Sequence, residues 1–160
     1  MSGMSKIVKT ISNIAFPFII IYGLYVIAHG HLTPGGGFQG GAVVASGLAM
    51  ILVAYGSVWT MGKIKEKNLS AIESLGALSF ICLAFFGLIF GTMFFNNWLA
   101  NSGSGLFGDI VSFGNTAANI NTAGIIPLMN FAVGLKVTAG LFAIVLVMAY
   151  ATHKVKREAE

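Results

Sequence analysis

Four long apolar stretches dominate this sequence, and each is long enough to cross a membrane. They cover approximately residues 7–28, 40–59, 69–95 and 125–152. A helix needs about 20 apolar residues to span the hydrocarbon core of a bilayer. The chain is 56% hydrophobic and only 9% charged, whereas a soluble domain carries about 25% charged residues. We therefore expect an all-α integral membrane protein, a single membrane domain with four transmembrane helices.

The basic residues are confined to one side of this predicted topology. Four spans place both ends of the chain and the connection after the second span on the same side. Eight of the nine basic residues fall there: Lys6, Lys9, Lys63, Lys65, Lys67, Lys154, Lys156 and Arg157. The positive-inside rule makes that side cytoplasmic. Basic residues at membrane edges do not indicate nucleic-acid binding, so we expect the partners to include the lipid bilayer and no nucleic acid.

The first span begins after the segment MSGMSKIVKT. Its apolar part is longer than that of a signal peptide, and no small-residue cleavage site follows it. We expect it to be retained as a membrane helix. A glycine-rich connection and a polar loop over residues 96–124 then lie on the opposite side of the membrane. A loop of that length without obvious structure is usually functional or covered by a partner.

The glycine-rich connection reads HGHLTPGGGFQGGA over residues 29–42. Glycine is the residue that most readily adopts positive φ angles, so we expect an irregular joint between the first two helices. Its letters match G-x-G-x-x-G, but a dinucleotide site needs a preceding strand and an acidic residue about 20 positions on. The next acidic residue is Glu66, and a membrane helix precedes the motif. The structural motif comprises Pro34, Gly35, Gly36, Gly37, Phe38, Gly40 and Gly41.

Lys136 is the ninth basic residue and the one with an unusual position. It lies about eleven residues into the fourth stretch, hence about 16 Å deep at 1.5 Å per residue. A lysine near the bilayer centre costs about 2.5–3.5 kcal/mol or more. The same counting places Glu73 about 15–20 Å away in depth. Lys136 is therefore expected to face a carboxylate of another polypeptide or a hydrated ion path; a purely structural pair between subunits is the alternative.

Three further ionisable residues have two interpretations each. Glu73 is either part of the ion path or an acid favoured by the positive end of its helix. His29 and His31 are either satisfied polar groups at a membrane surface or members of a proton relay, because histidine titrates near neutral pH. Two histidines with Cys82 as the sole cysteine do not supply a metal-ligand set, so we expect no metal.

Small residues recur at four-residue spacing in three of the spans. Gly87 and Gly91 form a GxxxG pair in the third, and similar stripes occur in the second and fourth. Such spacing lets helix backbones approach closely. The alternative is that small residues are simply common in membrane helices.

The string HGHLTPGGGFQGGAVVA, which opens the second helix, resembles the MnhB/MrpB subunit of Mrp-type multisubunit Na+/H+ antiporters. The string IPLMNFAVGLKVTAGL in the fourth stretch resembles a second segment of that family. The family has homologous subunits in archaeal membrane-bound hydrogenase and sulfane sulfur reductase complexes. The resemblance implies a small, cofactor-free membrane subunit of a prokaryotic plasma membrane, within a complex that couples Na+ and H+ movement. Pro34, the following glycines, Phe38 and Lys136 are its positions of interest.

Two alternative functions therefore follow from the sequence. In the first, the chain is a subunit of a cation/proton antiporter module and Lys136 borders an ion path. In the second, it is a non-conducting scaffold in the membrane arm of a redox complex. It is not itself catalytic in either.

Overall fold

The computed structural model describes residues 4–32, 34–91, 93–99 and 124–158. These residues form five helices and no strand: α1 (Lys6–Ala28), α2 (Gly37–Tyr55), α3 (Ser57–Lys63), α4 (Glu66–Phe90) and α5 (Ile126–Glu158). All except α3 are long and apolar enough to cross a membrane. The predicted all-α membrane fold with four candidate spans is confirmed. That the whole chain forms a single membrane domain stays a prediction.

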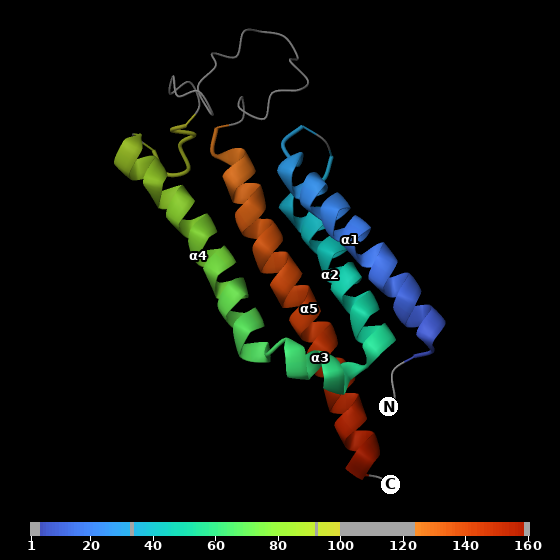
Figure 1. Ribbon diagram of the computed structural model, residues 1–160. Helices are drawn as coiled ribbons and strands as arrows, with labels where there is room; N and C mark the ends of the chain where they lie inside the picture. Colours follow the sequence, from blue (N-terminus) through green and yellow to red (C-terminus); the bar gives the residue numbers. More distant parts are fainter. Residues whose placement is uncertain (1–3, 33, 92, 100–123, 159–160) are drawn as a thin grey trace.

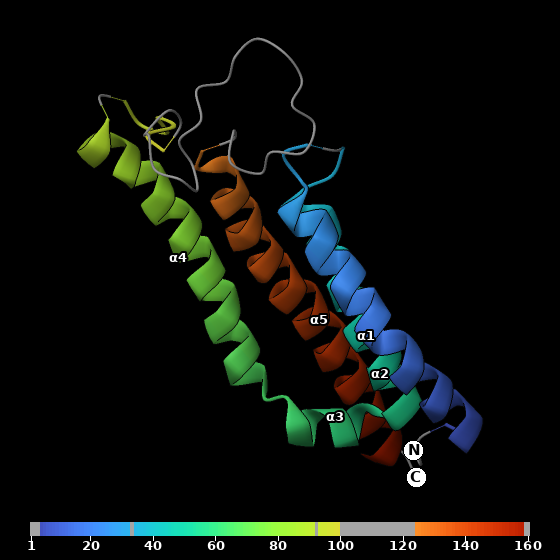
Figure 2. The ribbon, with the colours of Figure 1, turned by 45° about the horizontal axis from the view of Figure 1, so that its top comes forward.

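Helix α5 is the central element of the bundle. It packs against α2 on one side and α4 on the other, while α1 packs mainly on α2. Figures 1 and 2 show α4 on one side of α5 and the α1–α2 pair on the opposite side. The two chain ends lie at the same end of the bundle (Figure 1), as the topology requires. That this end is cytoplasmic stays a prediction.

The predicted second span, residues 40–59, is wrong at both ends. Helix α2 begins three residues earlier at Gly37 and stops at Tyr55. Gly56 has a φ of 91°, a backbone conformation that glycine adopts without a steric penalty. The chain turns there into α3, which contains Trp59 and lies across the base of the long helices (Figure 2). A single glycine thus converts the end of one predicted helix into a separate short helix.

The later boundaries also differ from those expected. Helix α4 covers residues 66–90 rather than 69–95, and α5 continues six residues beyond the predicted end at residue 152. The side chain of Asn97 accepts a hydrogen bond from the N–H of Ile125 at 2.8 Å, so the start of α5 is tied to the turn after α4. Pro127 lies in the first turn of α5, where its missing N–H is no loss.

The two glycines of the GxxxG pair, Gly87 in α4 and Gly91 just after it, have their nearest neighbours in the turn that follows α4 rather than in another helix. A Cβ atom on Gly87 would lie 2.7 Å from the backbone nitrogen of Asn96, and one on Gly91 would also meet Asn96. The N–H of Phe95 donates to the carbonyl of Ala84 at 3.3 Å. The two glycines therefore accommodate the turn that folds back over the end of α4.

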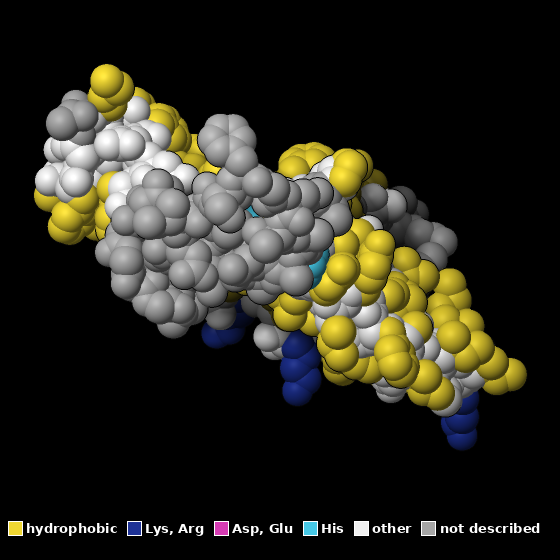
Figure 3. Space-filling model, turned by 90° about the horizontal axis from the view of Figure 1, so that it is seen from above, with side chains coloured by type: hydrophobic (Ala, Val, Ile, Leu, Met, Phe, Trp, Pro, Cys, Tyr) yellow, Lys and Arg dark blue, Asp and Glu magenta, His cyan; other side chains and the backbone are white. Residues whose placement is uncertain are grey.

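The buried core lies near α3. It consists of Ala45, Leu52, Leu69, Phe142 and Leu146. Elsewhere the large apolar side chains are mostly exposed, as along α1 and α4. Figure 3 shows hydrophobic side chains along the outside of the described helices. Outward-facing apolar side chains are what a lipid environment requires.

Candidate functional site

The glycines of α2 mark close contacts with two different helices. A Cβ atom on Gly40 would lie 2.7 Å from the carbonyl oxygen of Gly23 in α1. A Cβ atom on Gly41 would lie 2.8 Å from the carbonyl oxygen of Gly134 in α5, and the Thr138 hydroxyl donates to the Gly41 carbonyl at 3.3 Å. Real Cβ atoms essentially never approach a neighbour within 3.0 Å. These glycines therefore let three helices meet.

Part of the glycine motif is consequently helical rather than irregular. Gly37, Phe38, Gly40 and Gly41 belong to α2, and Phe38 is 62% exposed. Pro34, Gly35 and Gly36 remain in the joint. Gly35 has a φ of 111°, which explains a glycine at that position. Gly36 lies against Asn130 of α5: a Cβ there would be 2.9 Å from its Oδ1 atom. The joint is thus packed onto the first turns of α5.

The two histidines lie at this end of α1, where the helix joins the glycine motif. The His29 ring stacks on Tyr25 with 4.6 Å between ring centroids. His31 is half-buried, and neither of its ring nitrogens has a hydrogen-bond partner among the described residues. Burial, followed by the positive charge of nearby His29, lowers the pKa of His31 below its usual 6.5. The described residues contain no cluster of metal-ligating side chains.

Lys136 and Glu73 lie on the same interface, between α4 and α5. A Cβ atom on Gly76 of α4 would lie 3.0 Å from the Lys136 Cβ, and one on Gly140 of α5 would lie 3.3 Å from the Glu73 Oε1 atom. Each charged residue therefore lies against a glycine of the facing helix. Gly76 is three residues from Glu73, and Gly140 is four residues from Lys136. The two charged positions are separated by about one helical turn.

The depth estimate from sequence, about 15–20 Å of separation, is therefore wrong. It assumed that each helix starts at the membrane edge where its apolar stretch starts. Glycine contacts set the register of α4 against α5 instead, and hydropathy does not report such contacts. Glu73 is therefore nearer to Lys136 than that estimate placed it, and the expectation that Lys136 faces another polypeptide or a hydrated path stays a prediction.

Lys136 and Glu73 do not form an ion pair in the described part of the structure. Lys154 and Glu158 do form one there, with 3.9 Å between the Lys154 Nζ and Glu158 Oε1 atoms. Helices α4 and α5 are antiparallel (Figure 1), and helical side chains lean toward the N-terminus of their own helix. The Lys136 and Glu73 side chains consequently lean in opposite directions. Lys136 is exposed on the surface of the chain and Glu73 is half-buried.

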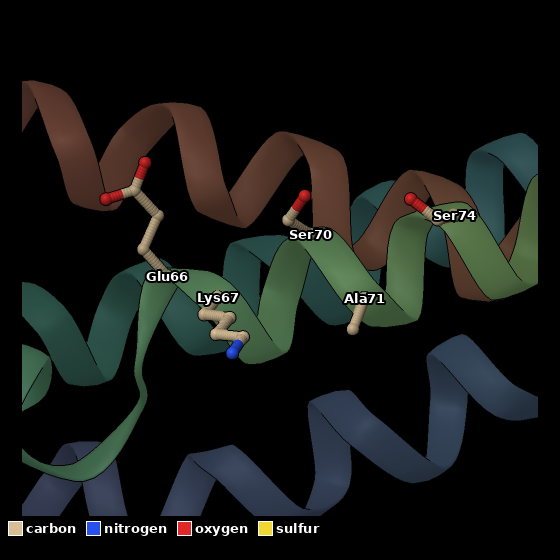
Figure 4. Close-up of a pocket in the computed structure, with 5 residues that line it drawn as sticks. All are labelled: Glu66, Lys67, Ser70, Ala71 and Ser74. Atoms are coloured by element: carbon tan, nitrogen blue, oxygen red, sulfur yellow. The ribbon is translucent and has the colours of Figure 1, made fainter.

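Polar residues on α4 extend from its first turn to the level of Glu73. Glu66, Ser70 and Ser74 point to one side of the helix, whereas Lys67 and Ala71 point to the other (Figure 4). Together these five residues line a pocket of about 500 Å³. Sequence reasoning missed this row, although the four-residue spacing of Glu66, Ser70 and Ser74 was a usable signal. The histidines do not belong to this site. The glycine joint next to them packs on Asn130 of α5, and Asn130 lies six residues, about 9 Å, from Lys136 along the helix axis.

The comparison with protein families decides the classification. The family model described as a domain related to the MnhB subunit of Na+/H+ antiporter matches residues 7–156. The chain belongs to the MnhB family. Its fold and the match together make it a membrane protein of that family.

Individual MnhB-related proteins agree. An uncharacterized protein of Methanocaldococcus jannaschii is 37% identical over 147 residues, which cover 88% of this chain and 52% of the relative. A Na(+)/H(+) antiporter subunit of Bacillus subtilis is 29% identical over 87 residues, 54% of this chain and 52% of that relative. The chain spans about half the length of these two relatives.

A solved structure shares both the fold and part of the sequence. A chain in the structure of the membrane-bound sulfane sulfur reductase, an archaeal respiratory membrane complex, matches with a TM-score of 0.71 and 27% identity. The match covers 92% of this MnhB-family chain and 61% of the other.

Proposed function

We propose that this chain is a membrane subunit of a multisubunit Na+/H+ antiporter module, in which Lys136 and Glu73 border the ion path. Support comes from the family and from the Bacillus subtilis relative, which is named as an antiporter subunit. The module operates in a prokaryotic plasma membrane, and its other subunits surround this one. Na+ and H+ are the ions it serves.

The reciprocal packing of Lys136 and Glu73 is the observation that carries this proposal. Each charged residue lies against a glycine of the opposite helix, so no side chain projects toward it from that facing position. Each can therefore reorient toward the other. Movement of either side chain would bring together or separate a positive and a negative charge, and such a change can accompany the passage of a cation along the path.

The exposure of Lys136 supports a position next to another subunit. A charged lysine in contact with lipid at this depth costs about 2.5–3.5 kcal/mol or more. A neighbouring subunit or water must cover it, and Glu73 supplies a counter-charge only when the side chains turn toward each other. Lys136 is thus a site of inter-subunit contact as well as of ion movement. His29 and His31 lie just after the last residue of α1, apart from Lys136 and Glu73.

The test measures Na+-dependent collapse of a pH gradient in vesicles that contain the complete native complex. Lys136→Met and Glu73→Gln remove one charge each, and Leu141→Met changes an exposed residue of the same helix. We expect either charge removal to lower transport about ten-fold or more, which corresponds to a loss of about 1.4 kcal/mol in the stabilisation of the ion on its path. Leu141→Met leaves transport unchanged.

The amount of assembled complex is measured for every variant. Full Na+ and H+ transport with Met at position 136, in normally assembled complex, would refute the ion-path proposal. Loss of assembly together with transport favours an inter-subunit structural role.

The second candidate is a scaffold subunit of a respiratory redox complex that conducts no ion. The 0.71 TM-score to a chain of the sulfane sulfur reductase complex favours it, as do the glycine contacts that join α1, α2 and α5. Purification with native neighbours distinguishes the candidates. Metal-cofactor subunits in the purified complex support the scaffold, and antiporter subunits alone exclude it.

A further inference from the structure

A groove at the basic end of the bundle changes from apolar to cationic along its length. It has a volume of about 710 Å³ and is formed by the end of α2, the start of α3 and the last turns of α5. Its apolar walls include Leu52, Val53, Val145 and Ala149. Its other end carries Thr152, His153 and Arg157.

The lining residues of α5 follow one face of that helix. Val145, Ala149, His153 and Arg157 are spaced by four residues, so they form a continuous stripe. From Val145 to Arg157 the stripe extends about 18 Å along the helix axis. Helix α5 has 33 residues, about 50 Å at the usual rise, whereas the hydrocarbon core is about 30 Å thick. The stripe therefore runs from the hydrocarbon into the headgroup layer.

The side chains of the stripe change from apolar to basic at the level where the bilayer changes from hydrocarbon to headgroups. Val53 and Val145 are exposed and apolar, which suits an acyl chain. Arg157 is exposed, and the neighbouring acid Glu158 is paired with Lys154. Among the described residues, none of those that line the groove is acidic. Basic pockets between membrane helices on the cytoplasmic side bind anionic lipid headgroups.

We propose that this groove binds an anionic phospholipid. One acyl chain lies along Leu52, Val145 and Ala149, and the phosphate binds the Arg157 guanidinium, which can donate two parallel hydrogen bonds to it. The Thr152 and His153 side chains border the headgroup. The proposed lipid site depends on neither the antiport nor the scaffold function, so its experiment tests it separately from them.

The experiment counts lipids on the native complex. The full chain, purified with its membrane partners, is equilibrated with micelles containing phosphatidylglycerol or phosphatidylcholine, and native mass spectrometry measures the lipid retained. Arg157→Gln removes the phosphate ligand. Lys63→Gln is the matched control, because it removes one exposed charge from the same end of the bundle, on α3 outside the groove. Ala149→Phe fills the apolar part.

We expect the wild type to retain phosphatidylglycerol in preference to phosphatidylcholine. Arg157→Gln lowers that retention about ten-fold or more, the effect of losing charge-assisted hydrogen bonds to the phosphate, while Lys63→Gln lowers it about five-fold at most, the factor of one basic residue near an anionic surface. Ala149→Phe lowers retention of both lipids. Inorganic phosphate does not displace the lipid, because it lacks the acyl chain.

Three outcomes overturn the proposal. Equal losses in Arg157→Gln and Lys63→Gln would show a diffuse charge effect rather than a site. Displacement by inorganic phosphate would show a simple anion site. Absence of retained lipid, with a photocrosslinker at position 149 capturing another subunit, would show that a protein helix fills the groove.

Discussion

Replacing Gly41 with alanine tests whether the glycine motif sets the distance between α2 and α5. The added Cβ would lie 2.8 Å from the Gly134 carbonyl oxygen and 2.9 Å from the Val137 Cβ, whereas ordinary contacts begin at 3.4 Å. The obstruction includes backbone, so rotation of a side chain cannot relieve it. The helices must separate locally by about half an ångström, which weakens the neighbouring dispersion contacts by about a quarter.

The energetic consequence follows from three contributions. Overpacking of a tight contact costs about 1–3 kcal/mol. The Thr138 hydrogen bond to the Gly41 carbonyl, already 3.3 Å long, is worth about 0.6 kcal/mol in a membrane helix pair. Alanine recovers about 0.5–1 kcal/mol of helix propensity. The net loss in the free energy of unfolding is about 0.6–3 kcal/mol, a change of about 3- to 150-fold in the unfolding equilibrium.

The assay is unfolding of the full chain in mixed micelles titrated with sodium dodecyl sulfate, followed by tryptophan fluorescence. Gly62→Ala provides the control, because Gly62 lies in α3 with nothing within 4 Å of an added Cβ. We expect that variant to be more stable than wild type by about 0.5–1 kcal/mol. A Gly41→Ala protein as stable as the Gly62→Ala protein would refute the reasoning.

Two further predictions concern polar groups of the N-terminal part of the chain: Asn13 within α1 and His31 shortly after its end. The Asn13 amide donates to the Tyr55 hydroxyl at 2.8 Å, so Tyr55→Phe should lower the free energy of unfolding by about 0.6 kcal/mol; a loss above about 2 kcal/mol in the same titration would contradict this small value. The lowered pKa of His31 means that the folded chain binds fewer protons than the unfolded chain at acidic pH. Its stability contribution is therefore complete above about pH 6.5 and lost as the pH falls through the folded pKa. Thermal unfolding at about pH 7.5 and about pH 5 should show a smaller acid-induced loss for His31→Gln than for wild type, and equal losses would exclude this role for His31.

The sequence predicts the number of spans because each needs only an apolar length, a local property. The common side of the two ends follows from that number and from eight basic residues at one end. Details that depend on contacts between helices could not be predicted. Gly56 ends α2 by adopting a positive φ, and no hydropathy pattern distinguishes it from Gly47 within the same span. Gly87 and Gly91 have the spacing of a helix-pairing motif but accommodate a turn.

The Lys136 site shows this limitation most clearly. Its position near the middle of an apolar span is readable from the sequence, and so is its need for a counter-charge. The proximity of Glu73 is not, because it depends on which residues of α4 lie opposite α5. Gly76 and Gly140 determine that register, and the sequence shows each of them only within its own helix. The row of Glu66, Ser70 and Ser74 escapes notice because serine is too weakly polar to interrupt an apolar stretch.

The packing of α5 limits how the proposed ion path can work. On one side the contact of Gly41 with Gly134 holds α5 against α2, and on the other Gly76 and Gly140 hold it against α4. A shift of α5 along its own axis by one residue, about 1.5 Å, would bring side chains into both glycine contacts. Helix α4 is less constrained, because it packs mainly on α5 and has an exposed outer face. Any cycle that alternately joins and separates Lys136 and Glu73 must therefore use their side chains or a tilt of α4, with α5 and the α1–α2 pair remaining fixed.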